Sequence, residues 1–172
     1  MADLAAGRFR RLGFGLAILT FAVDQIIKAT IMLGIDLPGR GGIELLPIFR
    51  LLWVENHGIS MGFLTADSAM DRWLLVAMTG AIAVAVIVWL WRERNKADAC
   101  ALGLVLGGAF GNITDRVRLG YVADFLDLHF GDWRPFLVFN VADAAISIGV
   151  IILLLRAFLA KPKAPEETID HA

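Results

Sequence analysis

Three short motifs in the second half of the chain carry side chains that could perform hydrolysis. They are GNITDR, GYVADF and FNVAD, which contain Asp115, Asp124 and Asp143. Two carboxyl groups held close together do not both ionise readily, so one keeps a proton while the other stays charged. We hypothesise that the ionised member of an Asp124/Asp143 pair takes a proton from water. The water attacks a peptide carbonyl, and the other member protonates the leaving nitrogen. The sequence does not assign the acid and the base, because the proton belongs to the coupled pair.

Amide and guanidinium groups accompany these acids at helical spacing. Asn112, Asp115 and Arg116 are spaced i, i+3, i+4, and Asn140 and Asp143 are spaced i, i+3. Each set therefore lies on one helix face, which we expect to point inward. The amides and the guanidinium could orient the carboxylates or stabilise charge in the transition state. The alternative for Asp115 and Arg116 is an interfacial ion pair that positions a helix end.

Two further pairs of residues lie earlier in the chain. Asp24 and Lys28 are spaced i, i+4, which favours a structural ion pair within one helix. The Asn56 amide could hydrogen-bond a peptide backbone or an aspartate, and Gly58 permits close backbone approach or a positive φ. The alternative for Asn56 and Gly58 is an ordinary turn.

The stretch from Gly58 to Gly62 also fits the G-x-S-x-G pattern of serine hydrolases, with Ser60 as the nucleophile. That pattern functions where a strand turns sharply into a helix above a parallel sheet, with an acid and a histidine later in the chain. No such scaffold is indicated, and the adjacent His57 would point away from Ser60 on an extended segment. We therefore expect no serine nucleophile.

Metal, cofactor and nucleic-acid chemistry are not indicated. The single cysteine is Cys100, and the three histidines, His57, His129 and His171, are too scattered for a zinc ligand set. A net charge of −1 gives no basic surplus for nucleic acid. We expect neither a metal nor a cofactor, and no nucleic-acid partner.

The composition is that of an integral membrane protein. The chain has 172 residues, of which 58% are hydrophobic, and a mean hydropathy of +0.70. Since a membrane helix needs about 20 largely apolar residues, four spans are predicted, over residues 12–33, 73–91, 97–114 and 136–160. The first could be a cleaved signal peptide, but it is long, carries Asp24 and Lys28 and has no small-x-small cleavage site after it.

The segments between the spans define the rest of the fold. The outer loop 36–72 is rich in strand formers and broken by Pro47, which predicts a small β platform. A second outer loop covers residues 115–135. We expect one α-helical membrane domain over residues 1–160 and a polar, disordered tail over 161–172.

The distribution of basic residues predicts the orientation. They precede the first span, fill the link between the second and third, and follow the fourth: Arg8, Arg10, Arg11, Arg92, Arg94, Lys96, Lys161 and Lys163. By the positive-inside rule, both termini and that link face the cytoplasm, so the two loops face outward.

Helix geometry places the aspartates at the outer boundary. At about 1.5 Å per residue, Asp115 lies about 28 Å from Lys96, and Asp143 lies about 27 Å from Lys161. With a hydrocarbon core of about 30 Å, both reach the outer surface. Asp124, in the outer loop between them, is brought to the same surface.

Three glycines in the third span indicate close helix packing. Gly103, Gly107 and Gly111 recur every four residues, a small-xxx-small seam that lets membrane helices approach closely. The seam would hold the GNITDR end against a neighbouring helix.

At these residues the sequence resembles the lipoprotein signal peptidases, also called signal peptidase II. The motifs appear in the family's order along most of the chain. They are Asp24 and Lys28 in DQIIK; Asn56 and Gly58 in NHGISMGFL; Asn112, Asp115 and Arg116 in GNITDR; Gly120, Val122, Asp124 and Phe125 in GYVADF; and Phe139, Asn140, Ala142 and Asp143 in FNVAD.

The resemblance implies an aspartic endopeptidase of the bacterial inner membrane, with Asp124 and Asp143 as the catalytic pair. Its substrate would be a prolipoprotein whose cysteine carries diacylglycerol, cut just before that cysteine on the outer side. The implied fold is a four-helix bundle with a small extracytoplasmic β platform and a second outer loop.

The resemblance also implies partners and one departure from the family pattern. The partners would be membrane lipid and globomycin-type lipopeptide inhibitors, with no obligate protein partner. Met61 stands where the family usually has phenylalanine, which we expect to alter packing near the lipid groove. Ser60 occupies a position where the family accepts alanine or serine, which also argues against a nucleophile.

Two other classes of function compete with a peptidase. Carboxylates in membrane helices also serve transporters, but transport sites usually lie near the midplane between structural repeats. In a membrane scaffold the charges would only pair helices. The position of Asp124, expected in a loop, argues against a scaffold.

Overall fold

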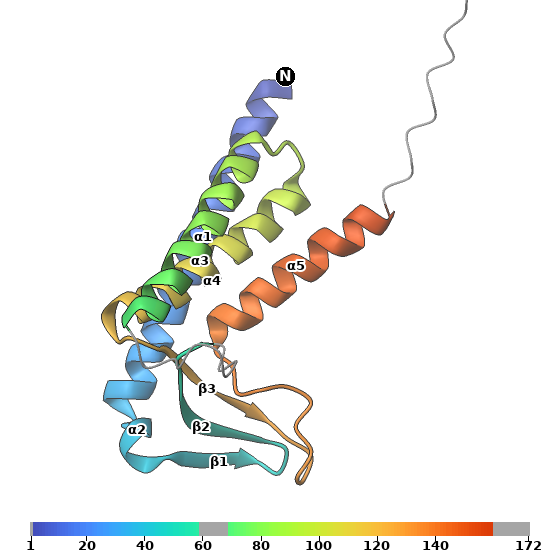
Figure 1. Cartoon of the computed structure of the whole chain (residues 1–172). Helices are drawn as coiled ribbons and strands as arrows, with labels where there is room; N and C mark the ends of the chain where they lie inside the picture. Colours follow the sequence, from blue (N-terminus) through green and yellow to red (C-terminus); the bar gives the residue numbers. More distant parts are fainter. Residues whose placement is uncertain (1, 59–68, 160–172) are drawn as a thin grey trace, which may run out of the picture.

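The computed structural model describes residues 2–58 and 69–159, which form a helical bundle standing on a small sheet (Figure 1). The elements in chain order are α1 (Ala2–Ala29), a π-helical turn (Thr30–Gly34), α2 (Leu37–Arg40), β1 (Gly42–Leu46), β2 (Phe49–Asn56), α3 (Ala69–Arg92), α4 (Lys96–Arg118), β3 (Val122–Leu128) and α5 (Val141–Leu159). The predicted Ser60 and Met61 and the tail 161–172 lie outside the described residues.

Four helices are long and apolar enough to cross a membrane, as predicted. In the described part of the chain these spans are Gly7–Gly34, Met70–Arg92, Lys96–Arg118 and Val141–Leu159. The start of α1, the link between α3 and α4 and the end of α5 lie at one end of the bundle, and the sheet lies at the other (Figure 1).

The two predicted boundaries beside the sheet that lie on α4 and α5 were wrong, and both differences have a physical cause. The third span was expected to end at residue 114, but α4 continues to Arg118 because partners on other elements satisfy its polar residues. The helix stops before Gly120, whose φ of 94° leaves the helical region. The fourth span was expected from residue 136, but α5 begins at Val141 because the Phe139 backbone is bonded to β3.

The glycine seam packs α4 against α1, as expected. A Cβ on Gly107 would lie 2.5 Å from the Ala17 carbonyl oxygen, and one on Gly103 would collide with the Gly13 carbonyl. On another side of α4, a Cβ on Gly108 would collide with the Ala142 carbonyl of α5. Small residues thus let α4 approach two helices closely, which fixes the ends that carry polar side chains.

The sheet has the antiparallel order β1-β2-β3, and its third strand comes from the second loop. The turn between β1 and β2 is at Pro47, as expected. Residue 124 was expected in a loop but belongs to β3, where it pairs with Val54. The strand is stabilised on its core side by Phe125, which is buried with Ile31, Leu37 and Leu51. This core attaches the sheet to the end of α1.

Candidate functional site

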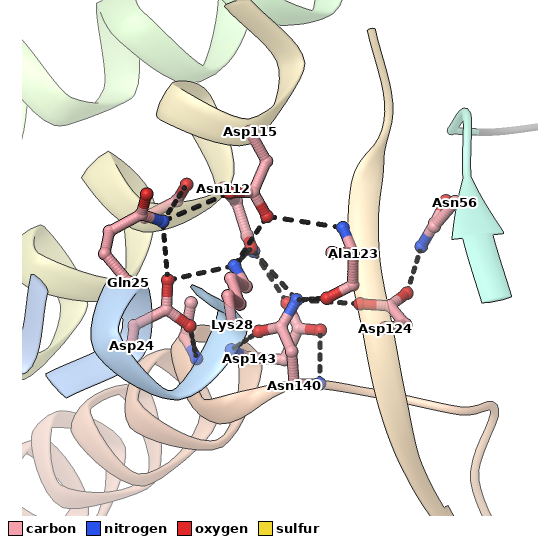
Figure 2. A network of polar contacts seen from close by, with 12 residues as sticks. Asp24, Gln25, Lys28, Asn56, Asn112, Asp115, Ala123, Asp124, Asn140 and Asp143 are labelled. Carbon is pink, nitrogen blue, oxygen red and sulfur yellow. Dashed lines mark hydrogen bonds and ion pairs between the residues drawn. The ribbon is translucent and has the colours of Figure 1, made fainter. Parts of the chain in front are cut away.

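The predicted site residues converge where the bundle meets the sheet (Figure 2). They come from α1, the end of β2, α4, β3 and the start of α5. All of them except Gly58 and Arg116 are joined by their side chains in one network of hydrogen bonds and ion pairs. The network has a charged core within the bundle and an edge of two carboxyl groups beside the sheet.

The charged core is a buried triad of Lys28, Asp24 and Asp115. The Lys28 Nζ lies 2.9 Å from Asp24 Oδ2 and 2.7 Å from Asp115 Oδ2, and the lysine side chain is 3% exposed. The pairing of Asp24 with Lys28 is confirmed. The alternative that Asp115 pairs with Arg116 is wrong, because the ion partner of Asp115 is Lys28 on a different helix.

Each triad carboxylate also accepts a backbone N–H from a neighbouring element. Asp24 Oδ1 accepts from Ala142 N at 3.0 Å, and Asp115 Oδ2 accepts from Ala123 N at 3.3 Å. The triad therefore fixes the start of α5 and the start of β3 relative to α1 and α4. Both of those elements carry one of the predicted catalytic acids.

Gln25 belongs to this core, and sequence reasoning missed it. Its Nε2 donates to Asp24 Oδ2 and to Asp115 Oδ1, both at 3.1 Å. The Gln25 amide therefore bridges Asp24 and Asp115, and it helps Lys28 to offset the repulsion between their two carboxylates. An amide directly after Asp24 in DQIIK was the available signal.

Replacing Lys28 with methionine should destabilise the fold strongly. The change leaves two carboxyl groups buried without their cation, and breaking a buried ion pair in this way costs about 3–5 kcal/mol. We expect the midpoint of thermal unfolding, followed by tryptophan fluorescence in detergent, to fall by many degrees. The matched control is Lys96→Met, since Lys96 is exposed at the start of α4. Equal midpoints for the two variants would contradict a structural role for the triad.

Asn140 is the residue that joins the two predicted catalytic acids. Its Nδ2 donates to Asp124 Oδ1 at 2.7 Å, and its backbone N donates to Asp143 Oδ2 at 3.3 Å. Its Oδ1 accepts from Asp143 N at 2.9 Å. The last two bonds form a reciprocal cap at the start of α5, in which Asn140 precedes the first helical turn.

This cap corrects the expectation that Asn140 and Asp143 share a helix face. Asn140 is not in the helix, and its spacing of three from Asp143 is that of a capping box. The helix N-terminus, with its partial positive charge, therefore lies beside Asp143. Asn140 is fully buried, so its orientation is tightly fixed.

The other asparagines hold the outer oxygens of the pair. Asn56 Nδ2 donates to Asp124 Oδ2 at 2.9 Å, and Asn112 Nδ2 donates to Asp143 Oδ1 at 2.7 Å. The Asn56 Oδ1 accepts from Gly58 N at 2.9 Å, which fixes the amide. Gly58 has a φ of 103°, which side-chain-bearing residues rarely adopt, so glycine is favoured at this position.

Arg116 lies near the acids without a hydrogen bond at its buried Nε. Asp143, Asp124 and Asp115 all act on it electrostatically. Within the described residues the Nε has no acceptor. The N–H is therefore available to an oxygen that enters the site.

The two acids open onto hollows of different character. Asp143 lines an apolar hollow of about 280 Å³ with Phe136, Phe139 and Ile148. Asp124 lines a more polar hollow on the sheet side. The pKa of Asp124 is raised to about 6, chiefly by burial and also by the nearby Asp143, against the lowering effect of the Asn56 hydrogen bond. Asp124 therefore retains a proton at a pH where an ordinary aspartate would be ionised.

Comparison with known proteins gives matches along the whole fold. The chain matches the model for signal peptidase (SPase) II over residues 16–159. It is 61% identical over 171 residues to a lipoprotein signal peptidase of Rhizorhabdus wittichii, covering 99% of each chain. It is 49% identical over 160 residues to a lipoprotein signal peptidase of Sphingopyxis alaskensis, covering 93% of this chain and 92% of that one.

Two solved structures, each described as a bacterial membrane enzyme, have the same fold. Their TM-scores to this chain are 0.71 and 0.74, at 26% and 27% sequence identity. The matches cover 90% and 88% of this chain and 94% of each of those chains. The similarity therefore spans the helices and the sheet that hold the polar network.

Proposed function

The chain belongs to the signal peptidase II family, and from this premise we propose that it cleaves diacylglyceryl-modified prolipoproteins just before the lipidated cysteine, using Asp124 and Asp143. It is a membrane-spanning peptidase. The observation that carries the proposal is Asn140, which bonds to both carboxyl groups and so holds them at one place. Hydrolysis then needs only water and groups of this chain.

The mechanism divides the acid and base roles between the two carboxyls. The ionised carboxylate takes a proton from water, whose oxygen attacks the peptide carbonyl carbon. The protonated carboxyl then gives its proton to the leaving nitrogen, and the C–N bond breaks. The raised pKa of Asp124 favours it as the proton carrier and Asp143 as the base.

The neighbouring donors have separate tasks in this mechanism. Asn56, Asn112 and Asn140 are already bonded to the carboxylates, so they orient them. The Arg116 Nε has no acceptor among the described residues, so it is available for the negative charge that develops on the carbonyl oxygen.

The location of the site follows from the orientation of the bundle. We place the sheet and both acids at the outer face of the bacterial inner membrane, because the basic segments lie at the opposite end. Diacylglyceryl chains would reach the apolar hollow beside Asp143 from the bilayer. A globomycin-type lipopeptide would compete for the same space.

Cleavage of a lipidated prolipoprotein by the purified protein in detergent tests the proposal. We expect mass spectrometry to show a mature product that begins with the lipidated cysteine. The pair keeps one proton up to about pH 6. Since the singly protonated pair is the proposed active form, kcat/KM should decrease as the pH rises through about 6, with a slope of one proton.

Two outcomes would contradict these expectations separately. A product cut elsewhere, or no product, would contradict the proposed function. A kcat/KM that increases through the same pH interval would show that the active pair carries no proton, and it would contradict a carboxyl of this pair as the general acid.

A further inference from the structure

Arg134, in the segment between β3 and α5, is held by a buried acid that the mechanism does not use. Its Nε donates to both oxygens of Asp127, at 3.1 and 3.3 Å. Asp127 is fully buried and also accepts from Arg50 Nε of β2 at 2.7 Å. The Asp127 carboxylate therefore holds the guanidinium at its Nε and does not engage its two terminal nitrogens.

The partly exposed side chain of Arg134 belongs to the lining of the hollow that contains Asp124. Arg134 lines this hollow with Asn56, Leu137 and Val138, and its side chain is 47% exposed. An arginine has five N–H donors, and the bonds to Asp127 use only the one on Nε. In the described part of the chain, no acceptor is bonded to the two terminal nitrogens, so they are available to a ligand.

The charges around the hollow leave Arg134 as its positive group. Asp127 divides its negative charge between Arg134 and Arg50, and Arg50 also pairs with Glu44 at 3.3 Å, so Asp127 does not fully neutralise Arg134. The hollow also contains two acidic groups, Asp124 and Glu55, and Glu55 lies 3.8 Å from His57 Nε2. An anionic or carbonyl oxygen would therefore be favoured near Arg134.

We propose that Arg134 is a specificity-determining residue that binds the substrate just after the lipidated cysteine and favours an acidic side chain there. This inference rests on the proposed function. The acyl chains and signal peptide suit the apolar hollow beside Asp143, whereas the mature chain is polar and leaves the membrane. A peptide bond between the two acids then directs the first mature residues toward Arg134.

The test uses three lipidated substrates that differ only at the residue after the cysteine, which is glutamate, glutamine or lysine. We expect wild-type kcat/KM to decrease in that order, with roughly a fivefold total range, as befits a half-exposed charge. In the Arg134→Gln variant the three substrates should have similar kcat/KM values, because the differences in KM disappear. The kcat for the glutamine substrate should change little. Arg134→Lys should restore part of the range.

Arg40→Gln is the matched control, because Arg40 is an exposed arginine of α2 that neither pairs with Asp127 nor lines the hollow. It should keep the charge preference. A wild-type enzyme that cleaves all three substrates equally would overturn the inference, as would an Arg134→Gln variant that keeps the preference. An equal loss for all substrates that depends on anionic lipid would assign Arg134 to a headgroup instead. Failure of the wild type to cleave any substrate would overturn the proposed function itself.

Discussion

Asp124→Asn and Asp143→Asn should each abolish cleavage of a lipidated prolipoprotein while the protein remains folded. Asparagine keeps the shape of aspartate but cannot carry the proton that the reaction moves. General acid–base catalysis contributes about 10²–10⁴-fold per group, so each variant should fall by at least that factor. Initial rates measured by mass spectrometry at saturating substrate would give the change in kcat.

The surroundings of the two acids predict that both variants remain folded. Each carboxylate lies at the edge of the network, and the triad of Lys28, Asp24 and Asp115 is untouched by either change. At position 124 the new amide offers one acceptor to two donors, Asn56 and Asn140, so we expect a modest loss of stability. Thermal unfolding should report that loss separately from activity.

Two control variants separate catalysis from general effects of charge. Asp132→Asn removes an exposed carboxylate from the segment that precedes α5, and it should leave kcat unchanged. Ser60→Ala removes the hydroxyl of the G-x-S-x-G match, and it should also remain active. Loss of cleavage in the serine variant, or normal cleavage in either variant of the acid pair, would reject the proposed pair.

The sequence predicted the elements of the bundle because hydrophobicity alone sets the length of a span. It could not predict where α4 and α5 end at the site, because polar residues decide those ends. Near the end of α4, Asp115 pairs with Lys28 and Asn112 accepts from Asn140, so partners on other elements satisfy these polar side chains of the helix. Such partners are distant in the sequence, so a hydropathy window does not register them.

The capping box at Asn140 could have been predicted from the sequence. An N-cap residue followed three positions later by an acid, just before an apolar run, is a signal for a helix start. The same spacing also fits a helix face, since both patterns place residues at i and i+3. The two interpretations differ only in whether Asn140 is inside the helix.

The third strand and the Asp127 cluster were beyond sequence reasoning for a different reason. VADFLDL has strand-forming residues. It becomes a strand of the sheet by pairing with β2, which lies about 70 residues earlier in the chain. Arg50 and Asp127 are opposite each other in that pairing. Only the register brings them together and fixes Arg134.

The arrangement of the two hollows explains why the acid pair belongs at the junction of bundle and sheet. The acid on α5 faces apolar side chains, and the acid on β3 faces a polar hollow. A peptide bond that joins a lipidated residue to a signal peptide needs both environments at once. Asn140 contacts both acids, so it holds the proposed catalytic pair at the boundary between those two environments.

A precursor without the diacylglyceryl group should therefore be a poor substrate. Acyl chains contribute about 0.8 kcal/mol of binding free energy per buried CH₂. Burial of only four methylenes therefore contributes about 3 kcal/mol, which corresponds to more than about a hundredfold in affinity. We expect kcat/KM to decrease by at least about a hundredfold for the unlipidated precursor, mainly through KM. A precursor whose cysteine thiol carries a small carbamidomethyl group distinguishes the effect of the acyl chains from the effect of blocking the thiol. It should be an equally poor substrate. Substrates with progressively shorter acyl chains, compared at a fixed detergent fraction, should lose kcat/KM stepwise. Equal turnover of lipidated and unlipidated precursors would show that the apolar hollow beside Asp143 does not bind the lipid.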